Sequence, residues 1–156
     1  MALLGATALV AAGCGTGDED SAAGEPLTKA QFIAKAGAVC REVKKAHQPY
    51  ADEVNKLPRG VGIERVAPLL EATLAESREG LARLRALESP RADRPAIDAY
   101  YDAAEKLLEA HAQLADAARA NDREKGEKVA ATTGELSNDE RRLATAYGLT
   151  DCDNVF

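Results

Sequence analysis

The amino-acid sequence predicts an all-α protein, an up-down-up-down four-helix bundle closed by one disulfide. In four segments, apolar residues recur alternately three and four positions apart, which is the spacing of a helix that packs one face against its neighbours. Short connections containing proline, glycine or asparagine separate these segments. Because short connections favour antiparallel neighbours, four such helices are expected to form a bundle. No segment has the strict alternation typical of a half-buried β-strand.

The first helix is expected to begin at Thr28, because Thr28 and Gln31 have the spacing of a capping box. Pro49 lacks a backbone donor and crowds the carbonyl of Lys45, so it predicts a kink. The sequence Pro58-Arg59-Gly60 ends the helix. The predicted inner face of this helix consists of Ile33, Ala36, Cys40, Val43, His47, Tyr50, Val54 and Leu57.

The second helix is predicted from about Gly62 to Leu87, with Pro68 bending its first turns and Ser89-Pro90 ending it. Its predicted inner stripe is Ile63, Val66, Leu70, Leu74, Ser77, Leu81 and Leu84. The third helix begins near Asp93, with Pro95 in the first turn, where a missing N–H costs little. Its predicted inner face is Ile97, Tyr101, Ala104, Leu108, His111, Ala115 and Ala118.

The fourth helix is expected to begin at the capping sequence Asn121-Asp122-Arg123-Glu124. It is the weakest of the four by propensity, since Gly126 and Gly134 lie inside it. Its period is kept by Val129, Thr133, Leu136, Leu143 and Tyr147. Gly148 predicts a left-handed end to the helix, after which Leu149 folds back onto the last turn.

The chain contains three cysteines, and an odd number leaves one thiol without a partner. If Cys14 serves another purpose, Cys40 and Cys152 make a pair that fits a disulfide in an oxidising compartment. In the predicted bundle, the fourth helix ends where the first helix begins, so the residues after Gly148 can reach back to Cys40. Two separate free thiols are the alternative, and a cytosolic protein would favour them.

The first 27 residues are interpreted as a leader, an anchor and a tether. Residues 1–13 are apolar and end in small side chains, as secretory signal peptides do. The sequence Ala11-Ala12-Gly13-Cys14 resembles the lipobox of bacterial lipoproteins, and the resemblance implies that Cys14 is lipidated and becomes the mature N-terminus. Residues 14–27 then form a flexible acidic tether to a domain at residues 28–156. The alternative is a disordered N-terminus with an incidental cysteine.

Two further segments carry a resemblance to a family. The segment from Gln31 to Cys40 that opens the domain, and the segment from Ala146 to Cys152 that closes it, are similar to small helical lipoproteins of actinobacteria. The resemblance implies an exported, membrane-anchored domain on the extracytoplasmic face, with a disulfide between its first helix and its tail. It implies no particular activity.

Charge and motifs exclude several classes of protein. The first 27 residues carry a charge of -4 of the net -6, so the domain is nearly balanced and lacks the positive patch of a nucleic-acid-binding protein. The sequence has no phosphate-binding glycine loop, no CxxC, no haem-attachment motif and no nucleophile elbow. We therefore expect no enzyme and no cofactor.

Two histidines form the one constellation that suggests a site. His47 lies 19 residues after Thr28 and His111 lies 18 residues after Asp93, so each is roughly 27 to 29 Å along its helix. Both could face one interior level of the bundle, with Glu71 and Glu135 at a similar depth. We expect them to be core residues satisfied by Tyr50, Tyr101 or water, because no further ligand has the spacing of a metal site.

Two classes of function are compatible with the sequence. The first is a noncatalytic interaction module, held at the membrane by its lipid, that recognises a component of the cell envelope. The second is an extracytoplasmic bundle that binds a metal, haem or a small apolar molecule, for which the two histidines are the candidate residues.

Overall fold

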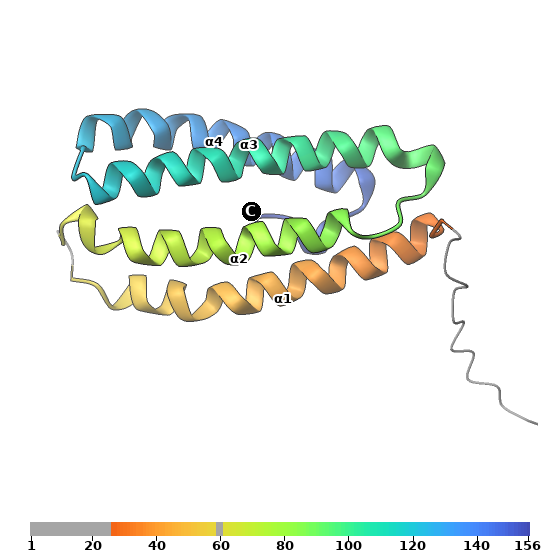
Figure 1. Cartoon of the computed structure of the whole chain (residues 1–156), viewed down its shortest axis with the longest axis horizontal. Helices are drawn as coiled ribbons and strands as arrows, with labels where there is room; N and C mark the ends of the chain where they lie inside the picture. The colour runs from red at the N-terminus through yellow and green to blue at the C-terminus, as the bar shows by residue number, and fades with distance from the viewer. Residues whose placement is uncertain (1–25, 59–60) are drawn as a thin grey trace, which may run out of the picture.

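The computed structural model describes residues 26–58 and 61–156, and it confirms the all-α bundle (Figure 1). No strand occurs among these described residues. The four long helices are α1 (Lys29–Lys56), α2 (Ala67–Arg85), α3 (Arg94–Arg119) and α4 (Arg123–Tyr147). Three short 3₁₀ helices accompany them: η1 (Ile63–Arg65), η2 (Arg91–Asp93) and η3 (Thr150–Cys152).

The first helix begins as the sequence predicts. The Thr28 side chain accepts from the Gln31 backbone N–H at 3.3 Å, and the Gln31 side chain accepts from the Thr28 backbone N–H at 2.9 Å. This reciprocal pair satisfies two donors that have no partner inside the helix. Leu27, the last residue of the predicted tether, is buried in the core, so the packed part of the chain begins one residue earlier. The α-helix continues through Pro49 to Lys56.

The second helix begins later than the periodicity indicates. The turn η1 precedes it, and α2 starts at Ala67. The prediction that Pro68 bends this helix is wrong, because Pro68 lies in its first turn, where backbone N–H groups have no acceptor within the helix. An apolar spacing continues through both pieces, which is why the sequence pattern merged them.

The remaining helix ends follow the expected chemistry. Pro95 lies in the first turn of α3, and the Asp122 carboxylate caps α4 by accepting from the Lys125 backbone N–H at 3.0 Å. At the end of α4, Gly148 has a φ of 102°. The Leu149 N–H then donates to the Ala144 carbonyl at 2.8 Å, which turns the chain back toward the core.

The helices pack in sequence order, α1 on α2, α2 on α3 and α3 on α4. The residues after α4, 149–156, form what we call the C-terminal segment, which runs back into the bundle (Figure 1). Its turn η3 contacts both α1 and α4. Leu149, Cys152, Val155 and Phe156 of this segment are buried. The segment therefore contributes a fifth piece of the core, which the four-helix prediction does not contain.

Burial is uneven along α1. Phe32, Ala36, Cys40 and Val43 are buried, and Phe32 packs edge-on against Tyr147 with 6.0 Å between ring centroids. Farther along the predicted inner face, Val54 is 41% exposed, which corrects its assignment to the core. The half of α1 that precedes His47 thus faces a closed core, and the half that follows it borders a more open region.

Candidate functional site

A pocket of about 220 Å³ lies at the level of the two histidines. His47 enters it from α1 and His111 from α3, so the structure brings together the two residues that the spacing placed at one depth. Helix α2 supplies one wall and the C-terminal segment another. The other lining residues are Leu70, Thr73, Leu74, Ser77, Asn154, Val155 and Phe156.

Burial favours the neutral form of both imidazoles. Burial lowers the pKa of His47, against smaller opposing effects of a hydrogen bond with the Thr73 backbone and the charge of Glu76. Burial also lowers the pKa of His111, and the nearby His47 lowers it further. Each ring therefore presents one donor and one acceptor nitrogen near pH 7.

The partner of His47 differs from the expected ones. Its Nε2 atom lies 3.1 Å from the Ser77 hydroxyl, whereas the Tyr101 hydroxyl donates to the Leu84 carbonyl at 2.8 Å. Both histidines line a pocket, which corrects the expectation of simple core residues. Ser77 belongs to the predicted inner stripe of the second helix, and its period places it opposite His47.

The two carboxylates predicted near the histidines are elsewhere. Glu71 pairs with Arg119 at the surface, and Glu135 is exposed on α4. Neither lines the histidine pocket. Among the residues that the structure describes, no group of three or more His, Cys, Asp or Glu side chains is arranged to hold a metal ion.

A second pocket, of about 250 Å³, adjoins the first. The two pockets share His47, Leu70 and Thr73 as lining residues. The second pocket extends between α1 and α2 toward the exposed side chain of Val54. Its remaining lining residues are Tyr50, Ala51, Asn55 and Leu69.

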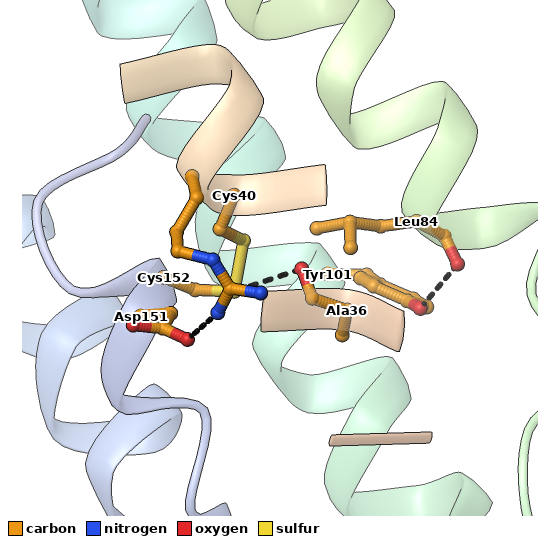
Figure 2. The surroundings of a disulfide bond; sticks show 7 residues. Ala36, Cys40, Leu84, Tyr101, Asp151 and Cys152 are labelled. Carbon is orange, nitrogen blue, oxygen red and sulfur yellow. Dashed lines mark hydrogen bonds and ion pairs between the residues drawn. A yellow bond between two sulfur atoms is a disulfide. The ribbon is translucent and has the colours of Figure 1, made fainter. Parts of the chain in front are cut away.

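Along α1, Cys40 precedes Val43 and His47 follows it. The disulfide and the histidine pocket therefore lie on opposite sides of Val43. Cys40 and Cys152 are joined, with their Cα atoms 5.0 Å apart, and both are fully buried (Figure 2), which confirms the predicted pairing. The Cys152 sulfur lies 3.8 Å from the Ala36 carbonyl oxygen, a polar contact in which the sulfur donates no proton because it is oxidised. Arg41 and Asp151, each next in sequence to one of the two cysteines, form an exposed ion pair.

A buried carboxyl group lies between α3, α4 and the C-terminal segment. Glu140 is fully buried, and neither of its oxygens has a hydrogen-bond partner; the same is true of the Tyr100 hydroxyl. Burial raises the pKa of Glu140 to about 7, and the Asp153 charge adds to this. The Tyr100 hydroxyl, which is close to the carboxyl group although their geometry is not that of a hydrogen bond, lowers the Glu140 pKa, as do the charges of Arg141 and Lys44. No local pattern separates Glu140 from the exposed acidic residues of the same helix.

Sequence reasoning also missed the part of the pocket that the C-terminal segment builds. Asn154, Val155 and Phe156 line the histidine pocket, and Val155 and Phe156 are at most 6% exposed. One signal was available in the sequence. Val155 and Phe156 are an apolar pair shortly after Cys152, and a disulfide from Cys152 to the first helix keeps the residues that follow it close to that helix.

No protein-family model, curated protein or solved structure matches the chain. Among the described residues, no helix combines the length and the apolar character needed to cross a bilayer. Cys14, the predicted signal peptide at residues 1–13 and the tether as far as residue 25 lie outside the described residues.

Proposed function

We propose that this chain is a lipoprotein anchored through Cys14 to the extracytoplasmic face of the cell membrane, and that its helical domain is a noncatalytic binding module. The observation that carries the proposal is the buried Cys40–Cys152 disulfide. Disulfides form and persist in oxidising compartments and are rare in the cytosol. Their pairing leaves Cys14 as the remaining cysteine, directly after an apolar leader.

The anchoring is tested by metabolic labelling with an alkyne analogue of palmitate. The wild-type chain is expected to incorporate the label, and Cys14→Ser is expected to lose it. Cys152→Ser is the matched control, because it removes a cysteine without touching the lipidation motif and should still be labelled. Equal labelling of the wild type and Cys14→Ser would contradict the proposal.

The side of the membrane is tested separately, by adding protease to intact spheroplasts. An extracytoplasmic domain is degraded under these conditions, whereas a cytosolic marker protein survives. Survival of the domain in intact spheroplasts, with degradation only after lysis, would place it in the cytosol.

For the binding role, an envelope component is the leading class of partner. A small molecule is the second candidate, and a specific observation favours it: two histidines, a serine and an asparagine converge on a pocket whose other walls are largely apolar. Pockets of this composition, with a few polar groups and perturbed pKa values, are typical of ligand sites.

A further inference from the structure

We propose that the two adjoining pockets form one site for an uncharged amphipathic small molecule, with its polar end at His47, His111 and Ser77 and its apolar part between α1 and α2. This inference rests on the second candidate function above. It is independent of whether Cys14 carries a lipid.

The first argument is continuity. His47, Leu70 and Thr73 line both pockets, so the two spaces meet along these three side chains. The volumes of about 220 and 250 Å³ are similar. Together they fall in the range of ordinary small-molecule sites, roughly 300 to 1,000 Å³.

The second argument is the absence of charge. No Lys, Arg, Asp or Glu lines either of these two pockets, although such residues make up 29% of the chain. Two other surface pockets of the described structure show the contrast. Arg78, Glu105, Lys106 and Glu109 line one of them, and Lys106, Glu109 and Lys128 line part of the other.

The lack of charged lining residues favours an uncharged ligand. A charged ligand would lose its hydration and find no opposite charge on the walls, which is costly in a partly desolvated site. The histidines do not supply that charge, since burial holds both in the neutral form near pH 7. An uncharged ligand bears no such penalty.

The third argument is the separation of polar from apolar lining. The first pocket offers two imidazoles, the Ser77 hydroxyl and the Asn154 amide, which can donate to or accept from an alcohol, amide, ester or aromatic amine. The lining of the second is mostly apolar, from Leu69, Leu70 and Val54, with smaller polar contributions from Tyr50 and Asn55. Val54 is exposed. A molecule with one polar end matches both halves.

The test uses two fluorescent probes that share a naphthylamine body and differ in charge. N-phenyl-1-naphthylamine is uncharged, and 8-anilinonaphthalene-1-sulfonate is an anion. Both are titrated at pH 7.5 into the oxidised full chain carrying Cys14→Ser, which needs no detergent. We expect saturable binding of the uncharged probe, at least about tenfold tighter than that of the anion, a ratio that corresponds to about 1.4 kcal/mol.

Two blocking variants and one control locate the binding. Ala51→Phe fills the second pocket from an exposed position on α1, and Leu70→Phe fills the boundary between the two pockets. Each is expected to weaken binding of the uncharged probe at least about tenfold. Thr132→Phe, placed in the charged pocket between α3 and α4, should leave binding unchanged. Circular dichroism and thermal melting establish that each variant is folded.

Three outcomes would overturn the inference. They are the absence of saturable binding of the uncharged probe, equal affinity for the two probes, and a loss in Thr132→Phe as large as that in Ala51→Phe. None of these outcomes affects the anchoring proposal, because lipid labelling of Cys14 is measured on a different residue with a different readout.

Discussion

Gly80 of α2 lies so close to Val43 of α1 that a Cβ atom built on the glycine would stand 2.3 Å from the valine Cγ2 atom. Val43 is buried and β-branched, so its side chain has little freedom to move away. The Phe156 ring lies 3.6 Å from the same Cβ position. The glycine therefore sets how closely α1 and α2 approach each other near the disulfide and the histidine pocket.

We predict that Gly80→Ala destabilises the domain, although alanine is the better helix former. The gain in helix propensity is about 1 kcal/mol, while forcing a methyl group into a filled core costs about 1 to 3 kcal/mol. Gly134→Ala is the matched control, since nothing lies within 4 Å of its Cβ position, and it should stabilise the domain. Urea unfolding measures whether each variant is more or less stable than the wild type. Stabilisation by Gly80→Ala would contradict the close approach of Gly80 to Val43.

A double variant tests the cause of the Gly80 effect. In the Val43→Ala background the atom that the new methyl group would strike is absent, so the penalty of Gly80→Ala should shrink or disappear. Residues in contact show such coupling, whereas distant pairs are additive. If the losses in unfolding free energy from Gly80→Ala and Val43→Ala simply add in the double variant, the penalty of Gly80→Ala does not come from contact with Val43.

We predict that reducing the Cys40–Cys152 bond lowers the unfolding free energy by about 4 to 5 kcal/mol in the chain-entropy model. The two cysteines are 112 residues apart in sequence, so the bond restricts nearly the whole of the domain at residues 28–156 when it is unfolded. Helical content before melting should change little, since the caps at Thr28 and Asp122 do not involve the bond. Thermal melting with and without reductant measures the effect, and unchanged melting temperatures would refute it.

We predict that Glu140→Gln stabilises the domain more at pH 8 than at pH 5. Burial raises the Glu140 pKa from 4.5 to about 7, so between these values the unfolded chain releases a proton that the folded chain retains. Wild-type stability from this group is therefore present at pH 4.5 and below, and is lost as the pH rises toward 7. Glutamine does not titrate, so the variant has no such loss. The difference in unfolding free energy between Glu140→Gln and the wild type should therefore grow with pH by about 3 kcal/mol at most.

The control for this prediction is Glu135→Gln, an exposed position on the same helix. Urea unfolding of the wild type and both variants at pH 5, 6.5 and 8 gives the comparison. Titration of His47 and His111 affects all three proteins alike and cancels in the differences. A Glu140→Gln difference that does not grow with pH would show that the carboxyl group is ionised without cost in the folded state.

Local chemistry made much of the fold predictable. The capping box at Thr28, the cap at Asp122 and the left-handed end at Gly148 are set by residues within a few positions of each other, and all three are present as predicted. The Cys40–Cys152 pairing followed from setting Cys14 aside and from helix order, which brings the end of α4 to the beginning of α1. Periodicity also put His47 and His111 at one depth of the bundle.

The features that could not be predicted depend on packing between distant segments. Nothing local distinguishes Glu140, which is buried beside Tyr100, from exposed Glu135. Glu71 has the right depth for the histidine site but turns to Arg119 at the surface, where its charge stays hydrated. The C-terminal segment is too short for a periodic signal, and its burial depends on contacts with α1 and α4, which are distant from each other in sequence.

The Cys40–Cys152 bond also closes a covalent ring that contains all three connections between the helices. A protease that cuts once in the connection between α1 and α2, between α2 and α3 or between α3 and α4 therefore leaves a single molecule. The two pieces remain joined at α1 and at the C-terminal segment, and they separate only when the sulfurs are reduced. A domain nicked in this way keeps its full mass apart from one added water, so damage to its surface connections would not release any helix from the rest of the domain.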